Sequence, residues 1–283
     1  MTARPVDQSS SPRTVHVVPT GGLLDLGLSE LWSYRQLLYF FAWRDVKVRY
    51  KQTLIGSAWA VLQPFAAMVL FTVFFGNLLE LSTEGIPAPV FYYSSLLPWT
   101  YFSLAVVTAS NSVVGHQNLI HKIYFPRLLL PMAAVLPGVI DFAIAFVVLV
   151  ALILIYGVGF SLSFLLFPLF VIMGVLLAIA MGVWLSILNA RFRDIRFVVP
   201  FLVQMLFFAS PIVYSANEIP EEWRTVYSLN PLVGVIEGFR WSVTGAGEAP
   251  GLPVFLSLLL VLVVLFGGLV YFRKEEATIA DIV

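Results

Sequence analysis

One uncharged stretch decides the fold of this chain: FAIAFVVLVALILIYGVGFSLSFLLFPLFVIMGVLLAIAMGVWLSILNA, residues Phe142–Ala190. A bilayer core about 30 Å thick needs roughly 20 apolar residues per helical crossing, so this stretch is too long for one span. It is interrupted at Tyr156–Ser161, where Gly157 and Gly159 favour a tight turn. The stretch therefore predicts two membrane-spanning helices joined by a short loop on the outer side.

Further spans are predicted on both sides of this pair. The first of the two helices begins near Leu128. Four more uncharged runs are long enough to cross the bilayer: Gln52–Leu79, Ile86–Gly115, Phe197–Asn217 and Ala249–Phe272. The chain is 60% hydrophobic and 11% charged, whereas soluble domains carry about 25% charged residues. We therefore expect an all-α membrane protein with six transmembrane helices.

The charged residues are sorted between the two sides of the predicted membrane. Of the sixteen Lys and Arg residues, only Arg224 and Arg240 fall in segments that alternation places outside. The other basic residues lie in four inner groups: the N-terminal region up to Lys51; Lys122 and Arg127; Arg191, Arg193 and Arg196; and Arg273 and Lys274. Because cytoplasmic segments carry an excess of Lys and Arg, both termini are expected in the cytoplasm.

Three regions are expected along the chain. Residues 1–28, rich in Ser, Pro and Val near the start, suit a flexible cytoplasmic extension without a secretory leader. Residues 29–51 suit a helix at the membrane interface, and residues 52–283 the six-span domain. The chain has no cysteine, which excludes disulfides and thiolate metal sites.

The interface helix is predicted from apolar residues at helical spacing, with Ser29 as a possible N-cap. Its apolar face holds Leu31, Tyr34, Leu38 and Phe41, widened by Trp32, Leu37 and Phe40. Its basic end holds Arg44, Lys47, Arg49 and Lys51. A helix with aromatic and basic faces tends to lie in the membrane interface. It serves either as a topology anchor alone or as a receiver of an anionic lipid-linked substrate.

The inner loop GHQNLIHKIYFPR, Gly115–Arg127, is more apolar than a linker requires. Residues Asn118 to Tyr124 suit a short helix that ends before Pro126, because the residue before a proline is disfavoured in helical geometry. Such a helix either packs on the membrane surface or docks on another protein.

Asp141 is the one acidic residue well inside a predicted span. A central Asp costs about 2.5–3.5 kcal/mol on the insertion scale, so it is expected to face protein or water. Pro131 and Pro137 precede it and free carbonyl groups in a kinked helix. A structural hydrogen-bonding role is favoured over a proton relay, which normally uses further intramembrane acids or histidines.

The outer segment Asn217–Pro250 is long and mixed in character. Asn230 and Pro231 mark a helix start, with Asn as the N-cap and Pro in the first turn. Glu237 and Arg240 are then three residues apart and able to pair. We expect short helices that dip back into the outer leaflet, which is possible only where the backbone is buried in protein or lines a watery cavity.

Several enzyme motifs are missing. The chain has no G-x-x-x-x-G-K-[ST] loop, so it does not hydrolyse ATP by that route. It also lacks H-E-x-x-H and G-x-S-x-G. No motif in the sequence therefore supports an enzyme, although membrane glycosyl and phosphoryl transferases can lack short motifs.

Five segments resemble permease subunits of bacterial ABC exporters of cell-surface polysaccharides such as O-antigen and teichoic acid. In chain order they are RDVKVRYKQTLIGSAWAVLQP (Arg44–Pro64), NLIHKIYFPRLLLP (Asn118–Pro131), NARFRDIRFVVPFL (Asn189–Leu202), SPIVY (Ser210–Tyr214) and NPLVGVIEGFR (Asn230–Arg240). The resemblance covers about Leu31 to the end of the chain. Its specificity comes from five segments in register rather than from any one of them.

The resemblance implies a homodimer in the bacterial plasma membrane that pairs with two copies of an ATP-binding subunit. ATP and Mg would bind that subunit, and this chain would bind no cofactor, metal or nucleic acid. ATPase coupling is implied for Asn118, Leu119, Ile120, His121, Lys122, Ile123 and Tyr124. Loading of the lipid-linked polysaccharide is implied for Arg44, Lys47, Arg49 and Lys51, and the outer gate includes Asn230, Glu237 and Arg240.

The resemblance also implies a channel between the two copies, formed by the first and fifth spans. A long glycan exceeds a closed pocket of about 300–1,000 Å³ and has to be threaded. Aromatic side chains suit such a path because they offer flat apolar faces with few fixed hydrogen bonds. The candidates are Trp59, Phe65, Phe71, Phe74, Phe201, Phe207 and Phe208, which would otherwise face lipid or neighbouring helices.

Three alternatives stay open from the sequence. The first is an ABC permease of the same build that exports a small molecule or lipid. The second is an integral-membrane glycan-modifying enzyme. The third is a secondary transporter, which the lack of an internal repeat and of further intramembrane acids disfavours.

Overall fold

The structure is a computed structural model that describes residues 28–51, 56, 58–247, 249 and 251–282, with side chains up to residue 276. The expected cytoplasmic extension lies almost wholly outside these residues. Within the described part, every regular element is a helix, as the sequence predicts.

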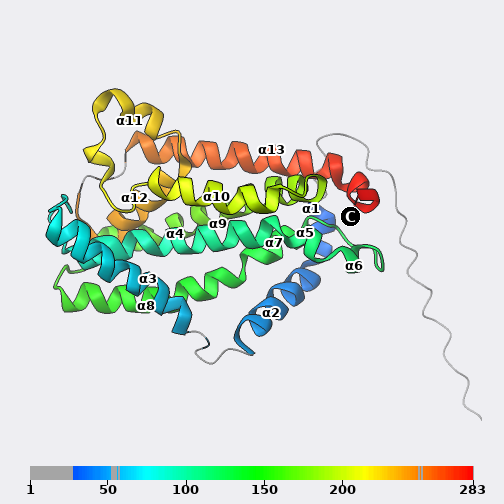
Figure 1. Ribbon diagram of the computed structural model, residues 1–283, viewed down its shortest axis with the longest axis horizontal. Coiled ribbons are helices and arrows are strands. Elements are labelled where there is room, and N and C mark those ends of the chain that lie inside the picture. Colours follow the sequence, from blue (N-terminus) through cyan, green and yellow to red (C-terminus); the bar gives the residue numbers. More distant parts are fainter. Residues whose placement is uncertain (1–27, 52–55, 57, 248, 250, 283) are drawn as a thin grey trace, which may run out of the picture.

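Long helices run side by side along the length of the molecule (Figure 1). Their bounds are α3 (Ala58–Phe71) continued by the π-helix η1 (Thr72–Leu78), α4 (Ala88–Ser110), α7 (Leu129–Val135) with α8 (Pro137–Ile155), α9 (Phe167–Arg191), α10 (Ile195–Phe208) and α13 (Leu252–Ile282). Shorter elements connect them: α1 (Leu28–Ser33), α2 (Arg35–Lys51), α5 (Ser112–Gly115), α6 (Gln117–Ile120), η2 (Leu162–Leu166), η3 (Ala216–Glu218), α11 (Glu221–Tyr227) and α12 (Pro231–Thr244).

Five helices in the described part are long and apolar enough to cross a membrane: Ala58–Leu78, Ala88–Ser110, Leu129–Ile155, Leu162–Arg191 and Leu252–Glu276. The predicted fifth span, Phe197–Asn217, holds only α10, a helix of 14 residues. At 1.5 Å per residue α10 is about 21 Å long, less than the bilayer core of about 30 Å. The helix ends before Ser210 and Pro211 because the residue before a proline avoids helical geometry.

Helix α4 forms the centre of the bundle and packs on α9, α8, α12 and α3. It buries large aromatic side chains, among them Tyr92, Tyr93 and Phe102. The hydroxyls of Ser94 and Ser95 donate to the carbonyl oxygen of Phe91 in the same helix, at 2.9 and 3.0 Å. The hydroxyls of these two serines are therefore satisfied within the helix, which allows this part of α4 to be buried.

The two ends of the bundle differ in composition. Figure 1 shows α1, α5, α6 and the C-terminus at one end, called the α6 end below. It shows α11 at the opposite end, called the α11 end, together with the end of the first span. The loop after α6 carries Lys122 and Arg127, and α11 carries Glu221 and Glu222. The separation of basic and acidic segments that the sequence predicts is thus a separation between the two ends of the fold.

The predicted turns and kinks are present at the expected glycines and prolines. Gly157 and Gly159 have φ angles of 66° and 76° in the turn before α9, values that glycine adopts without strain. The third span is interrupted at Leu136, between α7 and α8, and Pro137 opens α8. This break places Asp141 in the first turns of α8.

The N-terminal helix departs from the expectation in two ways. It is broken at Tyr34 into α1 and α2, and Ser29 lies inside α1 rather than at its cap. Its predicted apolar face is nonetheless the packed face, since Phe41 is buried with Leu31, Tyr34 and Leu38 around it. Of the side chains predicted to widen this face, Leu37 packs with this core, whereas Trp32 and Phe40 are exposed, as are Tyr39 and Trp43.

Close contact between α4 and α9 provides a test of this packing. A Cβ added at Gly182 would lie 2.5 Å from the Cβ of Ala109, so Gly182→Ala should force the two helices apart. Overpacking of a core costs about 1–3 kcal/mol. We expect a lower thermal unfolding temperature for the variant purified in detergent. Gly115→Ala is the control, since its added Cβ meets nothing within 4 Å; equal shifts in both variants would contradict the packing.

Candidate functional site

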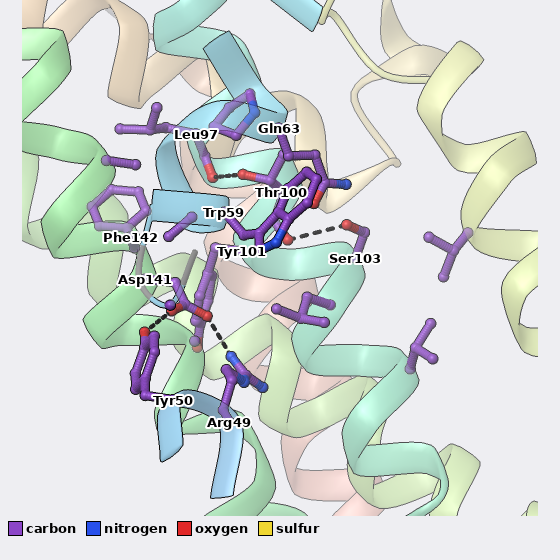
Figure 2. A pocket seen from close by; sticks show the side chains of 18 of the residues that line it. Arg49, Tyr50, Trp59, Gln63, Leu97, Thr100, Tyr101, Ser103, Asp141 and Phe142 are labelled. Atoms are coloured by element: carbon purple, nitrogen blue, oxygen red, sulfur yellow. Dashed lines mark hydrogen bonds and ion pairs between the residues drawn. The ribbon is translucent and has the colours of Figure 1, made fainter. Parts of the chain in front are cut away.

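A cavity of about 500 Å³ lies between α3, α4, α8 and α10, at the C-terminal end of α2. Figure 2 shows Arg49 and Tyr50 pointing at Asp141 from one side of this cavity, with Tyr101 next to Asp141. Trp59 and Gln63 of α3 line the cavity further along. The cavity joins the predicted interface helix, the first span and the intramembrane acid, three features that the sequence separates.

Asp141 is held by the end of α2. It accepts hydrogen bonds from Arg49, with which it forms an ion pair, and from the hydroxyl of Tyr50. Burial and the hydrogen bond to Asp141 raise the pKa of Tyr50 to about 12, so the hydroxyl keeps its proton and continues to donate. Asp141 is the one acidic residue in the lining of the cavity. This geometry fits the structural role, since Asp141 ties α2 to α8.

The four basic residues at the end of α2 fall into two kinds. Arg44 donates to Asp45 at 2.8 Å and to Nε2 of His116 at 2.5 Å, and Arg49 is bound to Asp141. Lys47 and Lys51 are exposed to solvent or lipid. The two arginines therefore hold α2 in place, whereas the two lysines are accessible to an incoming group.

The aromatic channel candidates also divide. Five have exposed side chains on α3, η1 and α10: Trp59, Phe65, Phe74, Phe201 and Phe208. Phe71 and Phe207 pack on each other with ring centroids 5.9 Å apart, and Phe207 lies 5.3 Å from Trp99 of α4. Those two side chains pack inside the helix bundle and connect α3 and α10 to α4. The exposed five leave an aromatic surface on α3, η1 and α10.

The predicted coupling segment is less helical than expected. Helix α6 ends at Ile120, and residues 121–123 continue as turn and bend. Ile120 is 7% exposed and packs with Phe41 and Phe125. Ile123 and Tyr124 are 48% and 59% exposed. Asn118, His121 and Lys122 are exposed as well, and Leu119 is half-buried. A partner can therefore touch the end of this segment but not Ile120.

A charged network at the α6 end was not foreseen from the sequence. Arg273 of α13 binds Glu30 of α1 at 3.1 Å and Glu276 at 2.8 Å. Glu30 accepts a hydrogen bond from Tyr124 at 3.2 Å, and Glu276 accepts one from the backbone of Arg127 at 2.8 Å. Most of these partners lie far apart in the chain, so no local sequence pattern predicts their contacts. The network connects the segment after α6 to α1 and to α13.

At the α11 end, the predicted pair of Glu237 and Arg240 is confirmed, with 2.5 Å between Oε1 and Nη2. Arg240 is 1% exposed and also donates to Ser95 at 2.8 Å and to the carbonyl oxygen of Pro211 at 3.1 Å. Its guanidinium lies 4.1 Å from the ring centroid of Phe91. Arg240 therefore joins α12 to α4 and to the chain that follows α10.

Asn230 acts as predicted and accepts the backbone N–H of Leu232 at 3.1 Å, capping α12. A second contact at this end was not predicted. Glu84, in the loop after the first span, accepts hydrogen bonds from Ser215 at 2.5 Å and from Asn217 at 2.6 Å. These contacts hold the segment after α10 against the loop after η1.

Among the residues that the structure describes, no three His, Asp or Glu side chains come together as a metal ion would require. The functional features of the described part are thus a membrane cavity, exposed aromatic surfaces and two charged ends.

Comparison with known families identifies the class of protein. The ABC-2 type transporter family matches residues 36–244, which includes the cavity, the α6 segment and α12. The chain belongs to the ABC-2 type transporter family.

Individual relatives are similar over most of their length. The O-antigen export system permease protein RfbA of Myxococcus xanthus is 28% identical over 214 residues, which cover 75% of this chain and 81% of the relative. The polysialic acid transport protein KpsM of Escherichia coli is 25% identical over 240 residues, 84% of this chain and 93% of the relative. The inner membrane transport permease YadH of Escherichia coli K12 is 25% identical over 217 residues, 73% of this chain and 83% of the relative.

The buried guanidinium at the α11 end provides a second test. Arg240→Met would leave Glu237 without its cationic partner, with the hydrogen bond from the backbone N–H of Ala216 at 2.8 Å remaining. Breaking a buried ion pair costs about 3–5 kcal/mol. We expect a large drop in the thermal unfolding temperature in detergent, partly recovered by adding Glu237→Gln. Arg224→Met is the control, because Arg224 is exposed and, among the described residues, donates to the backbone carbonyls of Ile219 and Asn217. A drop of similar size in the control would mean that burial of Arg240 is not the cause.

Proposed function

We propose that this chain is the membrane subunit of an ATP-driven exporter that moves a lipid-linked cell-surface polysaccharide, of O-antigen type, from the cytoplasm across the bacterial plasma membrane. The family match over residues 36–244 carries this proposal. Relatives named as O-antigen export and polysialic acid transport proteins support the class of substrate. ATP and Mg would bind a separate subunit, since this chain has no phosphate-binding loop.

The assembly would contain two copies of this chain and two of the ATP-binding subunit. The subunit would dock at the α6 end, on the exposed side chains of Ile123 and Tyr124. The network of Glu30, Arg273 and Glu276 supports this assignment, because it would pass a movement of the segment after α6 to α1 and α13.

The topology would contain six crossings with both termini in the cytoplasm. Helix α10 and the segment up to α11 would complete the crossing that α10 is too short to make alone. Helix α12, capped by Asn230 and buried against α4, α9 and α13, would be a re-entrant element below the outer surface. The concentration of basic residues near α6 and of acidic residues near α11 supports this orientation.

Loading would begin at α2, where Lys47 and Lys51 are exposed and each contributes roughly 1 kcal/mol to attraction by an anionic surface. The glycan would then pass along the exposed aromatic surface of α3, η1 and α10, between the two copies. The low burial of the first span within one chain supports a second copy at this surface. The contacts of Glu84, Glu237 and Arg240 would form the structure around the outer exit.

The export reaction itself tests the function. Reconstituted with its ATP-binding subunit in liposomes, the chain should move lipid-linked polysaccharide across the membrane only when ATP is supplied. Ile123→Glu should abolish substrate-stimulated ATP hydrolysis, because it places a charge in the docking contact. Ile123→Val, which keeps the side chain apolar, is the matched control and should retain most of the stimulation. Transport without the ATP-binding subunit would refute the proposal, and full stimulation in Ile123→Glu would refute the docking site.

Accessibility of single cysteines tests the path of the glycan. Because the natural chain has no cysteine, one can be placed at a time. Phe201→Cys and Phe208→Cys should react with a charged thiol reagent during ATP-driven turnover, since a channel contains water. Val147→Cys on α8 is equally exposed in the single chain but should face lipid and resist the reagent. Equal labelling at positions 147 and 201 would show that α10 does not line the channel.

A further inference from the structure

The cavity at the end of α2 has one polar side and one apolar side. Arg49, Tyr50, Tyr101 and Asp141 form the polar side, as Figure 2 shows. The rest of the lining is largely apolar, with Leu97, Leu104, Val107, Ala145 and Val203, and it also includes the polar residues Gln63, Thr100 and Ser103. A volume of about 500 Å³ lies within the range of small-ligand sites. The division into two sides fits an amphiphile better than a wholly polar molecule.

The Tyr101 hydroxyl indicates a ligand. The residue is 6% exposed and lines the cavity, and its hydroxyl has no hydrogen-bond partner among the described residues. Buried polar groups are almost always paired, so an exception calls for an explanation. The hydroxyls of Thr100 and Ser103 are paired, because they donate to carbonyl oxygens of their own helix at 3.0 and 3.1 Å.

The polar side offers donors and few acceptors. Asp141 already accepts from Arg49 and from Tyr50, one with each carboxylate oxygen. Arg49 has five N–H donors in a planar fork that suits carboxylate and phosphate groups. Tyr101 adds one more donor next to Asp141. A ligand that satisfies this side must bring several acceptor oxygens and negative charge, and a phosphate does both.

We propose that this cavity binds the phosphate-bearing headgroup of a lipid, and that the phosphate replaces Asp141 as the partner of Arg49. The Tyr101 hydroxyl donates to the same phosphate, and the first part of the lipid chain lies along the apolar side. Binding weakens the attachment of α2 to α8, since it breaks the ion pair between Arg49 and Asp141 and leaves the hydrogen bond from Tyr50 to Asp141. The identity of the lipid rests on the proposed function. The existence of the phosphate site rests on the cavity alone.

Lipid binding to the purified chain, without the ATP-binding subunit, tests the site. Native mass spectrometry in detergent would follow titrations with a polyprenyl diphosphate and with phosphatidic acid. Tyr101→Phe should weaken binding by about tenfold or more, as expected for a hydrogen bond to a charged group, with no loss of thermal stability. A hydroxyl that has only a packing role would not produce this combination.

Two further variants test the exchange of partners. Arg49→Gln should abolish saturable binding, whereas Asp141→Asn should tighten it, because the competitor for Arg49 loses its charge. Arg35→Gln is the matched control: it removes the same charge from α2 at an exposed position outside the cavity. Unchanged or weaker binding in Asp141→Asn would overturn the exchange. Equal losses in Arg35→Gln and Arg49→Gln would overturn the site in favour of general charge attraction.

The choice of lipids separates the possible sources of the phosphate. Tighter binding of polyprenyl diphosphate identifies the lipid carrier of the glycan, and equal binding of phosphatidic acid identifies any anionic membrane lipid. Both results support a phosphate site. Absence of saturable binding for both lipids overturns it. Because no ATP is used, this result is distinguishable from a failure of the export reaction, which would leave lipid binding unchanged.

Discussion

A charged side chain inside an apolar helix bundle needs a partner of opposite charge. Two ion pairs of this kind connect helices α2 and α12 to the rest of the fold. Asp141 of α8 takes Arg49 of α2, and Arg240 of α12 takes Glu237 while also binding the carbonyl oxygen of Pro211. An unpaired charge at either place would be strongly unfavourable. The pairs therefore fix helices that the hydrophobic core alone would position loosely, since apolar contact has no direction.

The two pairs connect different parts of the bundle. The first joins α2 to α8 beside the cavity of about 500 Å³, and the second lies next to the chain that follows α10. Between them, most of α4 is buried, and it packs on α9 through the contact of Gly182 with Ala109. The molecule thus combines a closely packed centre, which includes most of α12, with the helix α2, which is attached in part by polar contacts. Such contacts can be exchanged, whereas interlocked core packing cannot.

Local patterns in the sequence predicted local structure well. The spacing of Glu237 and Arg240 gave the ion pair, Asn230 gave the cap, and the face of α2 that packs is the one with helical periodicity. The predictions that differed concern where helices begin and end and which side chains are exposed. Proline ended α10 early, Ser29 lies inside α1 rather than at its cap, and Ile120 and Phe125 are buried while Ile123 and Tyr124 are exposed. Periodicity reports which face is apolar but not where tertiary packing stops a helix.

The sequence by itself determined the class of the protein: uncharged runs long enough to cross a bilayer, basic and acidic segments in alternation, and the motifs shared with a transporter family. These properties follow from composition along the chain, because water and lipid sort residues wherever the chain goes. Only the tertiary structure decided that Arg49 meets Asp141 and that Tyr101, whose hydroxyl has no partner among the described residues, lines a cavity. Those facts depend on which helices lie side by side, and contacts between residues 92 positions apart leave no periodic trace in the sequence.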